Sequence, residues 1–303
     1  MMNQLTFAEV EYTIKKRKTR RELFLEKLNE LLPWRQLESS VAKYYARGGM
    51  GRSPYPLPAM LRIHIMQFAY NLSDPAMEDA LYEIESIRRF AGIRLDRVPD
   101  EATILNFRHL LEEHQLGKKL FNKINKHLDR NGLILREGSI VDATIISAPS
   151  STKNKDGERD PEMRQTKKGN EWHFGMKMHI GVEDLLGLIH SIETTPASEL
   201  DLNMADKLFH GEEKRAWADA VYTGAENREA ISSRNLDWHI AMRPGKRKQL
   251  KFADIERAET TKASVRAKVE HAFFHIKRMF GYSKTRYRGL AKNTSRLYVL
   301  AGC

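Results

Sequence analysis

The chain has 303 residues, of which 41% are hydrophobic, and its 51 lysines and arginines outnumber 40 acidic residues to give a net charge of +11. This length suggests about two domains, and the basic excess favours a polyanionic partner such as nucleic acid. No apolar run approaches the ~18–20 residues of a membrane span. The polar N-terminus is unlike a signal peptide, and the one cysteine, Cys303, excludes a disulfide framework. We therefore expect a cytoplasmic, nucleoid-associated protein with no membrane partner.

Apart from a basic segment at 1–21 and a glycine-proline loop at 47–58, residues 1–130 have the apolar periodicity of helices. Ser73, followed by an aspartate and a proline, is a helix-start signal, and the segment 99–103 is another. In the helix that follows 99–103, we expect Asn106, Arg108 and His109 on the polar side. Two short helices joined by a turn are also a weak signal for a helix-turn-helix unit that binds DNA.

After residue 130 the pattern changes to strands that alternate with helices. Three β-rich runs predict an antiparallel meander, and helix, strand, helix, strand and helix then follow, which predicts a mixed α/β sheet. The predicted strands cover 138–146, 174–182, 187–195, 215–222 and 238–242, and the first two predicted helices cover 200–210 and 225–234. The polar segment 147–172 is either a disordered insert or a loop that contacts the substrate.

The last of these helices, residues 265–277, has two distinct faces. Its apolar residues follow the spacing of a buried stripe. Arg266, Glu270 and Lys277 fall on a second, narrow face, at about 100° per residue. A carboxylate between two cations suits a site that holds a divalent metal and contacts phosphate. The alternative for this segment alone is an exposed helix with ordinary ion pairs.

Two further carboxylates lie on predicted strands. Asp142 stands in the middle of an apolar run, and Asp219 lies near the end of a later strand. A buried aspartate is costly unless it is paired or bound to a metal, although Asp142 alone could simply bond to backbone. Together with Glu270, these oxygen donors suit Mg²⁺ or Mn²⁺ rather than zinc. Two such ions could promote chemistry at a phosphodiester.

The chain resembles bacterial insertion-sequence transposases of the DDE type, specifically the IS-five group of the broader IS-four-like superfamily. The resemblance covers nearly the whole chain and includes R-x3-E-x6-K at Arg266, Glu270 and Lys277. The matching segments are P-Y-P-L-P-A-M-L-R-I-H at 54–64, N-L-S-D-P-A-M-E-D-A-L-Y-E-I at 71–84, V-D-A-T-I-I-S-A-P-S-S-T-K-N-K at 141–155, R-D-P-E-M-R-Q-T-K-K-G-N-E-W-H-F-G-M-K at 159–177 and R-A-K-V-E-H at 266–271.

The resemblance implies a helical N-terminal DNA-binding domain over 1–130 and an RNase H-like catalytic core over 131–303. It implies that Asp142, Asp219 and Glu270 are the catalytic triad and the ligands of two Mg²⁺ or Mn²⁺ ions. The implied activity is strand cleavage at the element's ends, followed by strand transfer into target DNA. The implied partners are double-stranded terminal inverted repeats and target DNA, bound by a homodimer. The candidate DNA-binding residues are Arg266, Lys277, Lys167, Lys168, Trp172, His173 and Lys177.

Three features depart from the family pattern. A tyrosine expected before the R-x3-E-x6-K motif is Ala263, and the common D-x-G-Y is D-A-V-Y, where Val221 would be strained if the position needs a positive φ. Relatives are expected to continue beyond residue 303, and we therefore expect a truncated C-terminus. We therefore expect an exposed apolar patch that contains Phe280, Leu290, Leu297 and Leu300.

These departures leave two alternatives to a working transposase. One is a nuclease of the same fold that cuts DNA without joining strands. The other is a truncated, catalytically weak remnant that only binds terminal-repeat DNA.

Overall fold

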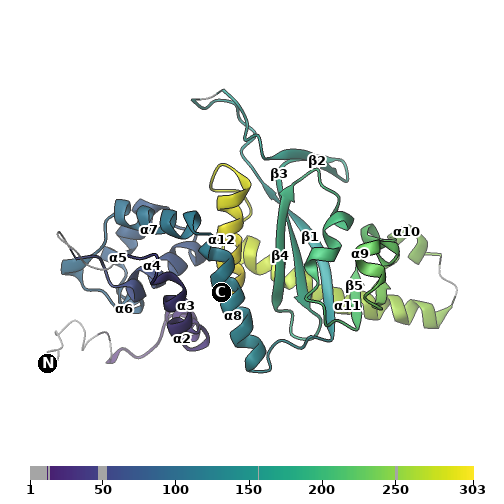
Figure 1. The fold of residues 1–303 in the computed structure, drawn as a ribbon, viewed down its shortest axis with the longest axis horizontal. Helices are drawn as coiled ribbons and strands as arrows, with labels where there is room; N and C mark the ends of the chain where they lie inside the picture. The colour runs from purple at the N-terminus through teal and green to yellow at the C-terminus, as the bar shows by residue number, and fades with distance from the viewer. Residues whose placement is uncertain (1–11, 13, 47–52, 156, 250–251) are drawn as a thin grey trace.

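The computed structural model describes residues 12, 14–46, 53–155, 157–249 and 252–303. A group of short helices forms one end of the elongated molecule and a mixed sheet with its own helices forms the other, with α8 and α12 between them (Figure 1). Within the described residues, no helix is long and apolar enough to cross a membrane.

The N-terminal region is helical, as predicted. Ser73 and Asp100 cap two of its helices, because their side chains accept hydrogen bonds from the backbone N–H groups of Ala76 and Thr103 at 3.3 and 2.7 Å. The helices are α2 (Arg20–Leu31), α3 (Trp34–Val41), α4 (Leu57–Ala69), α5 (Asp74–Glu83), α6 (Glu85–Ala91), the 3-10 turn η1 (Leu95–Arg97), α7 (Glu101–Glu113) and α8 (Leu116–Arg130).

Arg108 does not lie on the polar side of its helix, so that expectation is wrong. Its side chain is buried, and the guanidinium contacts Asp74 at 3.0 Å and Glu112 at 3.1 Å. These carboxylates compensate the charge that burial would otherwise leave unpaired. Arg108 thereby joins the start of α5 to the middle of α7.

The C-terminal region contains a mixed sheet, as predicted, but it has six strands because β2, which was not predicted, forms within the polar segment 147–172. β1, β3 and β4 are antiparallel neighbours, β5 and β6 continue the sheet beside β1 in parallel, and β2 pairs with the first part of β3. The strands are β1 (Gly138–Ser147), β2 (Arg164–Lys168), β3 (Glu171–Glu183), β4 (Ile189–Pro196), β5 (Arg215–Ala218) and β6 (Asp237–Ile240).

Several predicted boundaries differ from the structure. The predicted helix at 200–210 is the 3-10 segment η2 (Asp201–Leu208), and the predicted helix at 225–234 is two short pieces, η4 (Ala225–Asn227) and α9 (Glu229–Ser232). The strand predicted at 215–222 ends at Ala218. It ends there because the Asp219 carboxylate accepts a hydrogen bond from the Val221 N–H and starts the turn η3 (Ala220–Tyr222).

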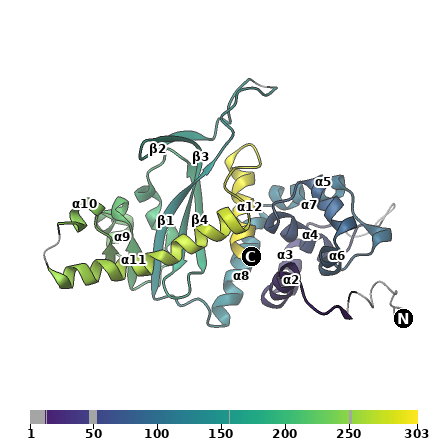
Figure 2. The same cartoon turned by 180° about the vertical axis from the view of Figure 1, so that it is seen from behind.

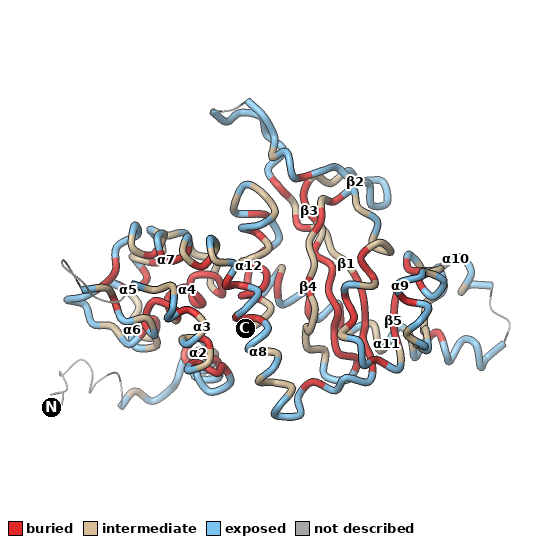
Figure 3. Tube along the Cα trace, viewed as in Figure 1, coloured by how far each residue is buried: buried red, intermediate tan, exposed pale blue. Residues whose placement is uncertain are grey.

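The long helix begins earlier than predicted. After α10 (Pro244–Arg247), α11 covers Ala253–Phe274 and continues into the π-helical turn η5 (His275–Met279). Figure 2 shows α11 crossing one face of the sheet, where it lies against β1, β3 and β5. The segment η2 packs on the other face. Each face of the sheet is therefore covered, and its strands carry buried residues on both sides (Figure 3).

The predicted exposed patch near the end of the chain is wrong. Phe280, Leu297 and Leu300 are buried, and Leu290 is partly buried against the same core. Their burial follows from the position of α12 (Leu290–Gly302), which packs against α8, α4 and β4. One apolar core therefore includes residues from the N-terminal helices, α11, α12 and the sheet.

The polar segment 147–172 is more ordered than a disordered insert would be. It extends away from the sheet and returns as β2 (Figure 1). The carboxylates of Asp160 and Glu162 accept hydrogen bonds from the N–H groups of Gly289 and Leu290 at 2.7 and 2.6 Å. The segment thereby supplies acceptors to the first turn of α12, where backbone N–H groups have no partner within the helix.

Candidate active site

Strand β1 and helix α11 together position two charged contacts. Asp142 and Thr144 are two residues apart in β1, so their side chains point to the same face of the sheet. On that face, the Arg266 guanidinium lies 3.2 Å from the Asp142 carboxylate, and the Lys277 amine donates to the Thr144 hydroxyl at 2.9 Å. Both cations of the R-x3-E-x6-K motif thus face the strand that carries Asp142.

Asp219 lies beside Asp142 on the neighbouring strand. β5 pairs with β1 in parallel, with Ala218 opposite Val141. Asp142 follows Val141 in β1 and Asp219 directly follows the last residue of β5, so the pairing brings them side by side. Asp219 is half-buried at the end of β5, where it also caps η3.

The third carboxylate, Glu270, comes from α11, one turn after Arg266. Its side chain is exposed, and its charge is close enough to act on both Asp142 and Lys277. Asp142, Asp219 and Glu270 therefore come from three separate elements and meet at one place. The sequence predicted all three of these residues.

The buried Asp142 carboxylate is destabilised as an anion. Burial is the main cause, and the negative charges of Asp219 and Glu270 add to it. These effects outweigh the Ala143 N–H bond and the Arg266 charge and raise the pKa of Asp142 to about 6. Three carboxylates that repel one another form a site that a bound cation would stabilise.

The cations around the site include a residue from the β2–β3 hairpin. Burial lowers the pKa of Lys277, and the charges of Lys168 and Arg278 lower it further, against the opposing effect of Glu270. Lys168 is therefore near Lys277, although 109 positions separate them in the sequence. The hairpin thus extends the positive charge beyond α11.

The β2–β3 hairpin exposes several of the predicted DNA-contact residues. Lys167 pairs across the strands with Trp172, and Lys168 pairs with Glu171. The Trp172 side chain is 67% exposed, so the alternative of a core tryptophan is wrong. His173 is half-buried, 3.9 Å from the Glu171 carboxylate. The aromatic ring and the two lysines are thus available on the surface.

In the fold, Lys177 lies apart from the other predicted DNA-contact residues. It alternates to the opposite face of β3 from Met176 and Met178, whose side chains lie in the core under α11. Its amine lies 2.9 Å from the Asp201 carboxylate and donates to the Glu199 carbonyl at 2.6 Å. Both contacts hold η2 against the sheet.

Two residues near the carboxylates were missed by the sequence analysis. Thr144 receives the Lys277 amine. Tyr222 is fully buried, and its hydroxyl has no hydrogen-bond partner among the described residues. Burial raises the pKa of Tyr222, with contributions from Asp142, Asp201 and Asp219. Two signals in the sequence could have indicated them. Thr144 is two residues after Asp142 and so lies on the same face of the strand, and Tyr222 is the last residue of the D-A-V-Y motif.

Val221 is not strained in the way that the departure from D-x-G-Y suggested. Among the described residues, a positive φ outside glycine occurs only at Asn71, Gln115 and Asn235. The Val221 side chain is exposed, and its N–H bonds to Asp219 at 2.9 Å. A β-branched residue therefore fits this turn.

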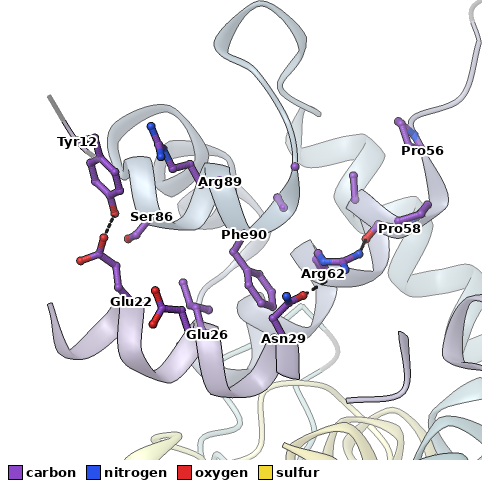
Figure 4. Close-up of a pocket in the computed structure, with 14 residues that line it drawn as sticks. Tyr12, Glu22, Glu26, Asn29, Pro56, Pro58, Arg62, Ser86, Arg89 and Phe90 are labelled. Carbon is purple, nitrogen blue, oxygen red and sulfur yellow. Dashed lines mark hydrogen bonds between the residues drawn. The ribbon is translucent and has the colours of Figure 1, made fainter. Parts of the chain in front are cut away.

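A separate pocket lies among the N-terminal helices, away from the carboxylates (Figure 4). Glu22, Glu26, Arg62 and Arg89 are among its lining residues. Its charges are of both signs, and the Arg62 guanidinium lies over the Trp34 ring, 4.2 Å from its centroid. These features do not resemble the carboxylate cluster on the sheet.

The donor atoms at the sheet fit a hard divalent cation. Carboxylate oxygens from Asp142, Asp219 and Glu270 are the ligands that Mg²⁺ and Mn²⁺ prefer. The raised pKa of Asp142 is the further observation that supports this fit, because a divalent charge would favour the ionised carboxylate.

The comparison with known families shows to which family the chain belongs. Residues 134–303 match the family described as transposase DDE domain, and residues 12–110 match the one described as transposase domain (DUF772). The first match covers more than half of the chain, so the protein belongs to the transposase DDE domain family. No solved structure matches the chain significantly.

The two family matches support a DDE transposase of the IS-four-like type, a class that acts on DNA and generally uses divalent metal ions. A DDE domain implies an RNase H-like fold, and the mixed sheet flanked by helices agrees with it.

Proposed function

We propose that this transposase cleaves DNA at the ends of an insertion sequence of the IS-five group and joins those ends to target DNA. The observation that carries the proposal is the meeting of Asp142, Asp219 and Glu270 on one face of the sheet, from β1, the end of β5 and α11. Two cations, Arg266 of α11 and Lys277 of η5, flank this cluster, and DNA phosphates are the matching anions.

Asp142, Asp219 and Glu270 would hold Mg²⁺ or Mn²⁺, which when bound supplies positive charge for phosphodiester cleavage and transesterification. Arg266 and Lys277 would bind phosphate oxygens beside the carboxylates. The attacking oxygen and the leaving oxygen lie in line at such a phosphate, and charge spreads over its nonbridging oxygens. Fixed cations at that place therefore favour the transition state.

The β2–β3 hairpin would extend the DNA-binding surface. Lys167 and Lys168 offer charges to the backbone, and the exposed Trp172 ring offers a face on which a base can stack. His173 adds a partly exposed polar group to the hairpin. We infer that residues 1–130 form a DNA-binding domain and that two copies of the chain act together on paired terminal inverted repeats.

Two structural expectations linked to the alternative of a remnant that only binds DNA are not met. Val221 has no positive φ, and of the predicted apolar patch Phe280, Leu297 and Leu300 are buried while Leu290 is partly buried. The nuclease alternative differs from a transposase in its products. A nuclease leaves cut ends, whereas a transposase also links its 3′ ends to a second duplex.

The test incubates the purified chain with labelled DNA from the element's ends, a target plasmid, and Mg²⁺ or Mn²⁺. We expect metal-dependent cuts at the element's ends and labelled ends joined to the plasmid. Cuts without joined product would favour the nuclease. Stable binding without cuts, in either metal, would contradict the proposal.

A further inference from the structure

A second cluster of possible metal ligands lies on the other face of the sheet from Asp142. His190 belongs to β4, and His210 and Glu213 lie in the segment between η2 and β5. One ligand atom from each of these three residues lies within 4.8 Å of the others. Ser139 of β1 adjoins them, three residues before Asp142 and on the opposite face of the strand.

The distances within this cluster are close to those of a coordination sphere. His210 Nε2 lies 3.3 Å from the Glu213 carboxylate. Two ligands that are each ~2.0–2.1 Å from a tetrahedral Zn²⁺ are about 3.3 Å apart. The Ser139 hydroxyl lies 2.9 Å from His190 Nε2 and 3.1 Å from the same Glu213 oxygen.

The ligand side chains are held in place by neighbouring groups. The Glu213 carboxylate accepts the N–H groups of His210 and Gly211 at 2.6 and 2.8 Å. His190 Nδ1 lies 2.9 Å from the Ser191 hydroxyl, which directs its Nε2 toward the cluster. Such contacts to the second ring nitrogen commonly orient histidines that bind metals.

The backbone also leaves room for the His190 ring. Gly181 of β3 lies against it, and a Cβ atom at this position would come within 2.7 Å of the ring carbon Cε1. Glu213 and Ser139 are buried, whereas His190 and His210 are partly exposed. The cluster is therefore enclosed, with access from the side of the two imidazoles.

We infer that His190, His210 and Glu213 form a structural site for a borderline transition metal, with Zn²⁺ as the best fit. Two imidazoles and one carboxylate suit Zn²⁺, Co²⁺ or Ni²⁺ rather than Mg²⁺. The Ser139 hydroxyl or a water would complete four ligands. Coordination through His210 Nε2 places the ring proton on Nδ1. Nδ1 then no longer accepts the hydrogen bond from the Glu212 N–H, which lies 3.3 Å away.

The site would stabilise the scaffold of the carboxylate cluster. It would join β1, β4 and the segment that leads into β5 by one set of bonds. β1 carries Asp142, and β5 ends at Asp219. This ion would be distinct from the ions that Asp142, Asp219 and Glu270 would hold. The experiment below therefore tests it independently of the proposed function.

The experiment uses the full chain without an affinity tag, freed of metal by chelation and kept in excess Mg²⁺. Co²⁺ is titrated and its visible absorption recorded, and Zn²⁺ is then added to displace it. The variants are His210→Ala and Glu213→Gln. His109→Ala, which removes an exposed imidazole of α7, is the control. Circular dichroism confirms the fold of each variant.

We expect the wild-type chain to bind one equivalent of Co²⁺ in a four-coordinate spectrum that Zn²⁺ removes and Mg²⁺ does not. Zn²⁺ should raise the unfolding temperature. Affinity should fall at least ~10-fold in His210→Ala and Glu213→Gln and stay unchanged in His109→Ala. Absence of saturable Co²⁺ binding in the wild-type chain would overturn the inference. So would a Co²⁺ affinity in the two ligand variants equal to that of the wild type.

Discussion

At the scale of single residues, Asp142 adds a pH dependence of its own to the stability of the metal-free protein. The pKa of its carboxyl is about 6 in the folded chain, against an ordinary value of 3.8. The folded state therefore binds this proton more tightly than the unfolded state. The resulting stabilisation is fully present below pH 3.8 and is lost as the pH rises through about 6.

We predict that Asp142→Asn removes this dependence in the presence of a chelator. As the pH rises between those two values, the free energy of unfolding of the variant should increase relative to that of the wild type, by up to roughly 3 kcal/mol. Urea denaturation at several pH values measures the difference. A difference that stays constant over this interval would show that Asp142 titrates normally.

Asp142 also shows what the sequence can and cannot establish about a site. Its place in an apolar run predicts burial, and the resemblance to DDE transposases implies its partners Asp219 and Glu270. The role of Thr144 is different, because it depends on how Lys277 extends from the π-helical turn η5. A local change in helix type leaves no clear mark in the sequence.

At the scale of elements, Arg108 illustrates burial that the sequence does not reveal. One of its partners, Asp74, is 34 positions away, so helical periodicity alone could not identify the ion pair. Lys177 is the opposite case. Strict alternation along β3 would have placed it on the face away from Met176 and Met178.

The start of α11 was predicted too late for a related reason. The first part of α11 consists mainly of exposed residues and lacks an apolar stripe. Its helical form gives no strong periodic signal until Val265, where the helix reaches the core. Five of the six strands were easier to predict because each carries a continuous or alternating apolar run, whereas β2 reads R-Q-T-K-K and has none.

We predict that Arg108→Met lowers the free energy of unfolding by about 2–4 kcal/mol, because it leaves two carboxylates without their cation. The matched control is Arg94→Met. The Arg94 guanidinium lies 3.7 Å from the Asp96 carboxylate, and both side chains are largely exposed. The free energy of unfolding should therefore change by no more than about 0.5 kcal/mol in this variant. Similar losses in the two variants, measured by urea denaturation, would contradict the role given to Arg108.

The β2–β3 hairpin provides a second test at this scale. Replacing Lys167, Lys168 and Trp172 together by alanine should weaken binding to end DNA by at least ~10-fold. The unfolding temperature should change little, because these side chains are exposed. Fluorescence anisotropy measures the affinity, and an unchanged dissociation constant would exclude the hairpin from the DNA interface.

At the scale of the whole molecule, the net charge of +11 governs association with DNA. Each phosphate that a lysine or arginine neutralises releases counterions. We predict that affinity for duplex DNA falls by ~100-fold or more between ~50 and ~200 mM salt. A flat salt dependence would show that phosphate contacts do not dominate binding.

The whole molecule also explains why the end of the chain is not an exposed apolar surface. Leu297 and Leu300 face a core that is shared by α8, α4 and β4. The apolar run at the end of the sequence marked residues that need to be covered, but the prediction that they are exposed was wrong. What covers that surface depends on contacts with distant segments, which no local pattern encodes.

The most direct test of the central claim is cleavage of end DNA by the wild type, Asp142→Asn and Asp237→Asn in Mg²⁺ and in Mn²⁺. Asp237 is an exposed carboxylate of β6, so its variant makes the same chemical change outside the cluster. We predict that Asp142→Asn binds the DNA as tightly as the wild type but does not cut it, while Asp237→Asn cuts normally. Cleavage by Asp142→Asn at the wild-type rate would contradict the assignment of the catalytic carboxylates.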